Sequence, residues 1–186
     1  MPVGTITTIA GIATLMAAAL VAGAGLLRFA ARFSNAAGAA RDRLVGFLGD
    51  QSLWLAWLAA LAATAGSLYY SEAAGFEPCS LCWYQRIALY PLVVILPVGA
   101  VARDRYLARY TLPLAATGGV IAVYHYFVQL FPEIEVACST AVSCGIVDVA
   151  AFGWLTLPLM SLVGFGAITT GVLYDRAYHR AAKHPE

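Results

Sequence analysis

The chain has 186 residues, of which 61% are hydrophobic and only 11% are charged, and its formal net charge is +1. Soluble domains carry about a quarter charged residues, so this composition argues against a soluble domain and favours an integral membrane protein. A net charge this small gives no indication of a nucleic-acid partner.

Five segments are apolar and long enough to cross a bilayer as helices, which takes about 20 residues. In chain order, they are residues 5–27, 51–71, 78–102, 110–132 and 149–174. The first lacks a positively charged N-terminal region and its arginines follow the apolar run, so we interpret it as an anchor helix and not as a signal peptide. We therefore predict an all-α integral membrane protein, a four-helix transmembrane bundle preceded by one additional N-terminal helix.

The segment between the first two spans, residues 35–50, is amphipathic. Its apolar residues could face lipid while its two arginines lie among the headgroups, which predicts an interfacial helix. The residues concerned are Leu44, Val45, Phe47, Leu48, Arg41 and Arg43. A plain linker is the alternative.

The basic residues indicate how the spans are oriented. Ten of the eleven Lys and Arg residues lie in segments 28–43, 103–109 and 176–183, all on one side of the predicted membrane. The two loops on the other side, 72–77 and 133–148, contain acidic residues and neither Lys nor Arg. Because basic loops stay in the cytoplasm, the N-terminus is predicted outside and the C-terminus inside.

All four cysteines lie on the predicted outer side. Cys79 and Cys82 begin the third span, and Cys138 and Cys144 lie in the loop between the fourth and fifth spans. Disulfides persist on that side of a membrane, so inert buried thiols explain the pattern poorly. Three interpretations stay open: two structural disulfides, a zinc site with the C-x-x-C pair as a half-site, or two pairs that exchange electrons.

The position of the first pair favours electron exchange. Pro78 fits the first turn of a helix, so that Cys79 and Cys82 would open the third span. A thiolate there meets unpaired backbone N–H groups and the positive end of the helix dipole, which lower the pKa of a cysteine. A structural disulfide does not need that position.

A charged side chain inside the third span marks a candidate ligand site. Arg86 lies seven residues after Cys79 and four after Cys82, so the three share one helical face. It lies nine residues past Glu77, about 13 Å along a helix, and an arginine at such depth usually has a function. The alternative is that its side chain extends to the headgroups.

The fourth span contains a counterpart at matching depth. His125 lies eight residues before Glu133, about 12 Å below the same surface, and Gln129 lies one turn nearer that surface on the same face. Arginine and neutral histidine both donate hydrogen bonds to carbonyl oxygens. A lipid-soluble carbonyl compound that accepts two electrons is a quinone, which predicts a quinone site here. For the histidine alone, an interhelical hydrogen bond is the alternative.

At these residues the chain resembles a known family. The stretch PCSLCWYQRIALYP, residues 78–91, resembles the first cysteine motif of the disulfide-bond formation protein B/C family, the DsbB- and BdbC-like thiol:quinone oxidoreductases. The stretch YHYFVQL, residues 124–130, resembles that family's histidine-bearing helix, and the second cysteine pair falls in the expected outer loop. The resemblance covers about residues 51–174.

The resemblance implies an enzyme that reoxidises an extracytoplasmic thioredoxin-fold thiol oxidase of the DsbA/BdbD type. The electrons would pass to a membrane quinone, ubiquinone or menaquinone, and so sustain disulfide bond formation. Cys79 and Cys82 would be the pair next to the quinone, with Cys82 in contact with it. Cys138 and Cys144 would meet the partner, with Cys138 forming the mixed disulfide.

The same resemblance implies that Arg86 binds and polarises the quinone and that His125 and Gln129 line its site. It implies a multi-pass protein of the cell membrane, with both cysteine pairs outside and no metal. We accordingly divide the chain into an N-terminal helix with its interfacial segment (1–50), the catalytic bundle (51–174) and a basic cytoplasmic tail (175–186).

Two features depart from the family pattern. The N-terminal span is additional to the usual four, and the second cysteine pair is only six residues apart, as in the shorter C-type members. A membrane protein with two structural outer-loop disulfides stays a competing interpretation. The WYQR context and the cysteine order argue against an enzyme of the vitamin K epoxide reductase type.

Overall fold

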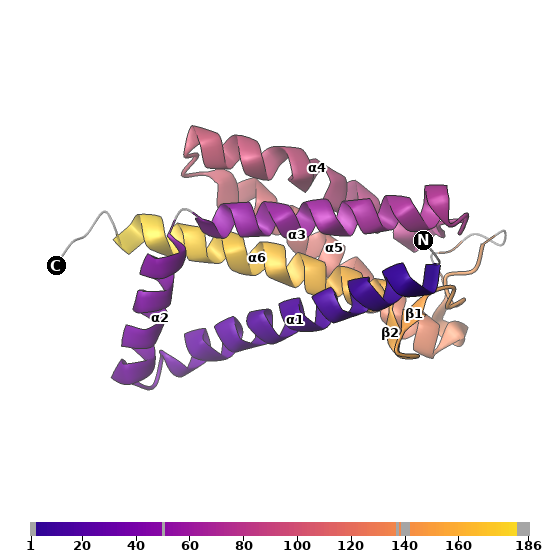
Figure 1. Ribbon diagram of the computed structural model, residues 1–186, viewed down its shortest axis with the longest axis horizontal. Helices are drawn as coiled ribbons and strands as arrows, with labels where there is room; N and C mark the ends of the chain where they lie inside the picture. Colours follow the sequence, from indigo (N-terminus) through magenta and orange to yellow (C-terminus); the bar gives the residue numbers. More distant parts are fainter. Residues whose placement is uncertain (1–2, 50, 137, 139–141, 182–186) are drawn as a thin grey trace.

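Five long helices make up most of the chain (Figure 1). The computed structural model describes residues 3–49, 51–136, 138 and 142–181. The long helices are α1 (Val3–Ala30), α3 (Gln51–Leu68), α4 (Ser80–Ala102), α5 (Leu107–Leu130) and α6 (Leu157–Ala181). All five are long and apolar enough to cross a membrane, α3 together with the π-helical turn η1 (Tyr69–Ala73) that continues it. The prediction of an all-α membrane protein with five spans is confirmed at this level.

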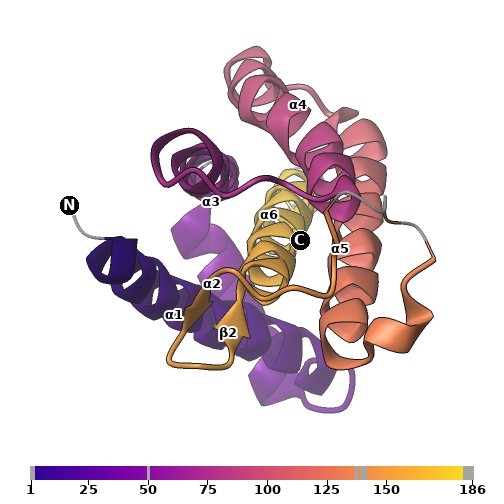
Figure 2. The ribbon, with the colours of Figure 1, turned by 90° about the vertical axis from the view of Figure 1, so that its right-hand side faces the viewer.

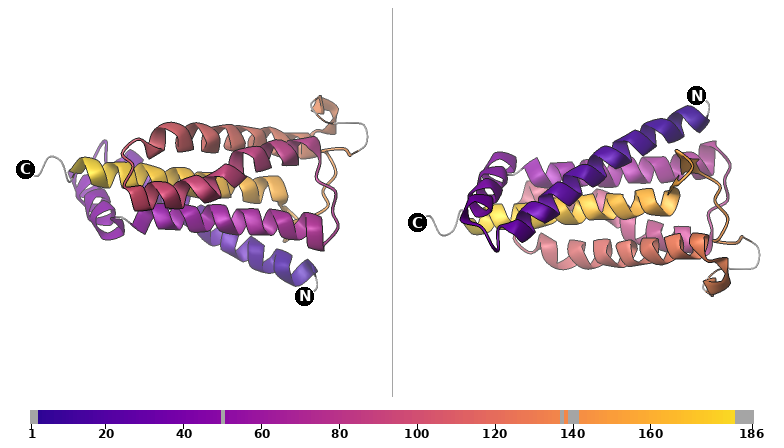
Figure 3. Two further views of the ribbon diagram at one scale, coloured as in Figure 1. Left: turned by 90° about the horizontal axis from the view of Figure 1, so that it is seen from above. Right: turned by 90° about the horizontal axis from the view of Figure 1, so that it is seen from below.

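Four of the long helices pack in the order α3, α4, α5 and α6, and α6 closes the ring by packing on α3. The fifth, α1, packs on the outside of α6 (Figure 2). Figure 3 shows that α1 is inclined to the other four helices. The N-terminus and the C-terminus lie at opposite ends of the bundle (Figure 1). We call the end where α4 begins and α5 stops the cysteine end, because both cysteine pairs lie there.

A shorter helix, α2 (Asn35–Leu48), connects α1 to α3 at the end opposite the cysteines (Figure 1). It begins where the Ser34 side chain accepts a hydrogen bond from the Ala37 N–H, at 3.4 Å. It ends at Gly49, whose φ of 44° lies in the left-handed region that glycine adopts readily. A helix is therefore present where a plain linker was the alternative.

The faces of α2 differ from the prediction at one residue. Val45 was expected to face lipid but is only 5% exposed, because α2 packs on α1 and α6. Phe47, by contrast, is 85% exposed and is available to a lipid phase. Asp50, at the end of the predicted segment, lies outside the described residues.

A hairpin precedes α6, where helix was predicted from residue 149. Its strands, β1 (Ala150–Ala151) and β2 (Leu155–Thr156), pair antiparallel. The turn between them has two left-handed residues, Phe152 with φ 56° and Gly153 with φ 79°. Pro158 then lies in the first turn of α6, where the missing N–H of proline costs no hydrogen bond. These local turn signals override the apolar composition that predicted a longer helix.

At its other end, α6 continues beyond residue 174 to Ala181, so part of the predicted tail is helical. Asp175 and His179 lie one turn apart with side-chain atoms 3.4 Å from each other, a favourable spacing for a helix. Lys183, also predicted in the tail, lies outside the described residues.

The largest apolar cluster lies between α3, α4, α5 and α6, away from the cysteines. Leu92, Leu96 and Ile168 are fully buried there. Gly118 of α5 allows close contact with α6, because a Cβ atom at this position would lie 2.2 Å from the Phe165 ring. The bundle is therefore tightly packed along this half, and the cavity described below lies nearer the cysteine end.

Candidate redox site

The site begins with the first turn of α4. Cys79 is the N-cap residue, with an extended backbone (φ −69°, ψ 171°), and Cys82 lies in the first turn. The C-x-x-C motif thus opens the helix, as expected from the sequence. Pro78 lies just before the cap and not in the first turn, because the extended conformation of Cys79 delays the helix to Ser80.

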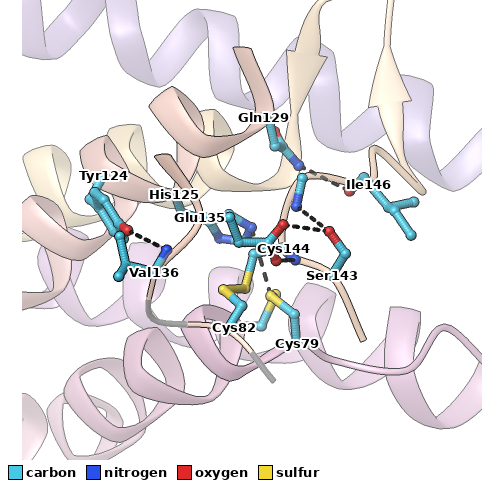
Figure 4. Close-up of a disulfide and its surroundings, with 12 residues drawn as sticks. Cys79, Cys82, Tyr124, His125, Gln129, Glu135, Val136, Ser143, Cys144 and Ile146 are labelled. Carbon is cyan, nitrogen blue, oxygen red and sulfur yellow. Dashed lines mark hydrogen bonds between the residues drawn. A yellow bond between two sulfur atoms is a disulfide. The ribbon is translucent and has the colours of Figure 1, made fainter. Parts of the chain in front are cut away.

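Cys79 and Cys82 are thiols with sulfur atoms 3.2 Å apart (Figure 4). Cys79 Sγ also lies 3.7 Å from His125 Nε2. The hydrogen bond from the Cys82 thiol lowers the pKa of Cys79, and His125 adds to this effect while burial opposes it. Because the histidine is hydrogen-bonded to Cys79, negative charge on the reduced pair is favoured on that sulfur.

A chain of hydrogen bonds orients His125, which is 3% exposed. The Ser161 hydroxyl donates to Gln85 Oε1 at 2.6 Å, and Gln85 Nε2 lies 3.0 Å from His125 Nδ1. An amide N–H can only donate, so Nδ1 accepts and the neutral imidazole carries its proton on Nε2. That proton points at the Cys79 sulfur. Three helices, α4, α5 and α6, therefore hold one nitrogen–sulfur contact.

Arg86 is held inside the bundle. It is 7% exposed, and its Nε and one Nη donate to the Ser67 hydroxyl and carbonyl oxygens, each at 3.0 Å. Its guanidinium also lies 5.1 Å from the centre of the Trp83 ring, one turn earlier on α4. These contacts with α3 and α4 hold the guanidinium in one place inside the bundle, and they do not resemble a side chain that extends freely to the headgroups.

A cavity of about 290 Å³ lies beside these residues. Cys82, Gln85, Arg86, His125 and Ser161 all contribute to its wall, and Cys79 does not. Most of the remaining wall consists of small or apolar side chains from α1, α3 and α6. Its size is near the lower end of the range typical of small-molecule sites, about 300 to 1,000 Å³. Of the first pair, Cys82 therefore lines the cavity, while the Cys79 sulfur contacts the histidine.

The second pair, Cys138 and Cys144, forms a disulfide (Figure 4). Cys144 is 1% exposed and packs in one cluster with Cys79, and Cys82 and Cys138 pack against that cluster. The two pairs are distant in sequence but lie together at the cysteine end. Thiol–disulfide exchange requires direct contact between sulfur atoms, and the shared packing keeps the two pairs close to each other.

Glu135 holds the loop that carries the disulfide. One of its carboxylate oxygens accepts from the Cys144 N–H at 2.6 Å, and the other accepts from the Ser143 hydroxyl at 2.7 Å. A carboxylate oxygen also lies within 4.8 Å of both sulfur atoms. A negative charge this close opposes the formation of thiolates at Cys138 and Cys144, so it favours the disulfide form.

Of the three side chains predicted to bind a ligand, the structure brings two to the cavity. Gln129 does not line it, because at the end of α5 its side chain meets the returning loop and Nε2 donates to Ile146 O at 3.4 Å. A four-cysteine zinc site also does not fit, because disulfide sulfurs are not thiolate ligands.

Sequence reasoning missed Gln85, Ser67, Ser161 and Glu135. Gln85 offered a signal, since it lies three residues after Cys82 and hence on a neighbouring part of the same helical face. Ser67 and Ser161 belong to other spans, and nothing in their local sequence indicates which helix they meet. Glu135 is one of several acidic residues in its loop, so its role depends on how the loop folds.

Comparison with known proteins agrees with this geometry. The family model described as "Disulfide bond formation protein DsbB" matches residues 50–174. The "Probable disulfide formation protein C 1" of Bacillus cereus is 42% identical over 121 residues, which is 62% of this chain and 85% of the relative. The "Disulfide bond formation protein C" of Bacillus subtilis is 41% identical over 115 residues, 61% of this chain and 83% of the relative.

A relative from another bacterial genus is similar to the same extent. The "Probable disulfide formation protein" of Coxiella burnetii is 40% identical over 119 residues, 62% of this chain and 81% of the relative. No solved structure matches the chain. The resemblance deduced from the two motifs is thereby confirmed, and the matched region contains α3, α4 and α5, most of α6 and all the site residues named above.

Proposed function

The chain belongs to the DsbB family of disulfide bond formation proteins, and from this premise we propose that it is a membrane thiol:quinone oxidoreductase. It reoxidises a thioredoxin-fold thiol oxidase and passes the electrons through two cysteine pairs to a membrane quinone. One observation carries the proposal: the two pairs pack in one cluster, and Cys82 lines a cavity that a buried arginine also lines.

The residues around the cavity fit a quinone. A guanidinium has five N–H groups, and the two bonds to Ser67 use two of them, so donors remain for a carbonyl oxygen. Most of the remaining wall is small or apolar and suits a ring and an isoprenoid chain, while Glu77 and Asp148 also line the cavity. A bound quinone supplies an acceptor of two electrons and two protons. Arg86 and His125 would hold it, next to Cys82.

The first step is exchange with the partner. A partner thiolate attacks Cys138, the Cys138–Cys144 bond breaks, and Cys144 leaves as a thiolate. A second partner thiolate then attacks the partner sulfur of the mixed disulfide, which releases Cys138. The partner leaves oxidised, and the loop now carries the two electrons on a dithiol. Cys138 is the accessible sulfur, since Cys144 is almost completely buried.

The second step moves the electrons to the first pair, which must be a disulfide when it receives them. The Cys144 thiolate attacks Cys79, which packs in the same cluster, and Cys82 leaves as a thiolate at the cavity that Arg86 also lines. Cys138 then attacks Cys144, re-forms the loop disulfide and releases Cys79. After this step the loop pair is again a disulfide and the two cysteines of α4 are thiols.

The third step restores the first pair. Cys79 and Cys82 form a disulfide as two electrons and two protons leave them. Gln85 keeps the proton of neutral His125 on Nε2, so the histidine stabilises negative charge on Cys79 during this change. Arg86, in the wall of the cavity, stabilises negative charge that develops there as the electrons arrive.

The orientation inferred from the basic residues belongs to the same proposal. The cysteine end lies outside the cell membrane, where the partner works, and α2 and the end of α6 lie in the cytoplasm. Residues 51–174 act as the catalytic bundle, residues 1–50 as an additional helix with an interfacial segment, and residues 175–186 as a basic tail.

Anaerobic turnover with purified components tests the function. A reduced DsbA-type partner is mixed with the protein and with ubiquinone or menaquinone analogues, and quinone reduction is followed by absorbance. The wild type should reduce the analogue, and Cys82→Ser should reduce none. Ser80→Ala, at a position between the two cysteines that does not line the cavity, should retain the rate. Undiminished turnover by Cys82→Ser would remove Cys82 from the electron path and refute the mechanism.

A further inference from the structure

The helix α1 lies outside the region that matches the family, yet it forms part of the cavity. The match begins at residue 50, whereas Ala10, Ala13, Thr14 and Ala17 of α1 all line the cavity. Their spacing of three, one and three residues places them on a single helical face. Facing them across the same cavity are Arg86 and His125, each more than nine-tenths buried.

Two contacts hold α1 in this position. The Thr7 hydroxyl of α1 and the Tyr70 hydroxyl of η1 share a hydrogen bond of 3.0 Å, and both residues are buried. Gly11 packs directly on the hairpin, since a Cβ atom there would lie 2.6 Å from Ala151 Cβ. Tyr70 itself lines the cavity, so α1 is fastened at the cavity's edge.

Along the cavity, α1 and α3 both pack on α6, and each packs far more extensively on α6 than on the other. The wall that α3 contributes is also small, including Ala59, Ala63 and Gly66. The other flanks are closed by packed helix pairs, α3 with α4 and α5 with α6. The space between α1 and α3 is therefore the side on which a long apolar chain can leave the cavity for the bilayer.

We propose that α1 is a wall of the quinone site, and that its small residues determine how much room the quinone ring and the first isoprenoid units have. The isoprenoid chain leaves between α1 and α3. This inference rests on the proposed function, because it takes a quinone as the occupant. It gives the additional helix a role in ligand selection as well as in anchoring.

Photolabelling of the full-length protein tests the inference directly. A photoreactive short-chain ubiquinone analogue is bound to the protein in lipid nanodiscs, irradiated, and the labelled peptides are identified by mass spectrometry. Label within residues 10–17, displaced by excess unlabelled quinone, is the expected result. Saturable binding with label confined to α3, α4 and α6 would overturn the inference while leaving the proposed function intact. If no saturable binding occurred, the proposed function would fail with it.

Matched variants test the wall by a second measurement, the equilibrium dissociation constant of the unlabelled analogue. Ala17→Phe fills the cavity and should weaken binding about tenfold or more, as overpacking of a confined site does. Ala19→Phe makes the same change on the exposed face of α1 and should leave the affinity unchanged. Both variants should still exchange with the reduced partner at the loop disulfide, which shows that they are folded. Equal affinities for the two variants would refute a wall role.

Discussion

Replacing Gln85 with leucine removes the amide that orients His125 and keeps most of the side-chain volume. The amide accepts from Ser161 at 2.6 Å and contacts His125 Nδ1 at 3.0 Å. Ser161 lines the cavity and its hydroxyl can turn to another partner, whereas Nδ1 of the 3% exposed histidine cannot. The free energy of unfolding should therefore fall by about 1–3 kcal/mol, the cost of leaving one buried polar group without a hydrogen bond.

The same change should raise the pKa of Cys79. Without the amide N–H, the proton of His125 is no longer held on Nε2, and the hydrogen bond to the thiolate weakens. A hydrogen bond to a charged group is worth about 1.5–3 kcal/mol, so the titration midpoint should rise by at most about two pH units. The pKa should stay below its ordinary value, because the hydrogen bond from Cys82 is the larger cause and is retained.

The assay is ultraviolet absorbance of the thiolate as a function of pH. With the loop disulfide intact, Cys79 and Cys82 are the chain's two remaining cysteines, so the signal belongs to this pair. Gln129→Leu is the matched control, since it makes the same replacement on α5 outside the cavity and should leave the midpoint unchanged. A folded Gln85→Leu protein with the wild-type midpoint would refute the tautomer argument.

The sign of the pH dependence follows from the lowered pKa. A thiolate favoured in the folded state stabilises the reduced protein above the ordinary thiol range, and this contribution is lost as the pH falls through the lowered pKa of Cys79. In Gln85→Leu, whose folded-state pKa is higher, the loss should therefore be smaller in total and complete at a higher pH than in the wild type.

Three further changes test other parts of the site. Arg86→Lys keeps the charge but loses the planar donor group, so the KM for quinone should rise about tenfold. Ser67→Ala, which removes one hydrogen bond that orients the guanidinium, should raise the KM less. An unchanged KM in both variants would make the role of the guanidinium structural. Glu135→Gln removes the negative charge beside the loop disulfide, so the Cys138–Cys144 disulfide should be easier to reduce when it is equilibrated with glutathione. An unchanged reduction potential of this disulfide would contradict the electrostatic role of Glu135. Cys144→Ala should accumulate a covalent partner adduct at Cys138, detected by non-reducing electrophoresis; an adduct at another cysteine would reverse the assigned order.

The five spans could be predicted from the sequence because the requirement is local. A helix in lipid satisfies its own backbone hydrogen bonds, so an uncharged run of sufficient length identifies a span without knowledge of its neighbours. The same period places Cys82 and Arg86 on one face of α4, which is why the sequence predicts that they lie together, as they do in the cavity wall. The prediction was wrong at the start of α6, where a hairpin turn at Gly153 replaces helix.

Contacts between helices depend on how the helices pack, which cannot be predicted from the sequence of any one helix. Depth alone placed Gln129 with His125, but the side chain at the end of α5 is directed by the loop it meets, and it bonds to Ile146. Conversely, Gln85 acquires its role only because α5 and α6 bring His125 and Ser161 to either side of its amide.

The sequence by itself determined the spans, the helical face that carries Cys82 and Arg86, and the family, since each depends on residues close together in the chain. Only the tertiary structure decided that Cys144 packs beside Cys79, that Ser67 anchors Arg86, and that α1 completes the cavity. The physical reason is that hydrophobic segments of similar composition are interchangeable to a lipid, whereas hydrogen bonds and close packing between them require one particular arrangement.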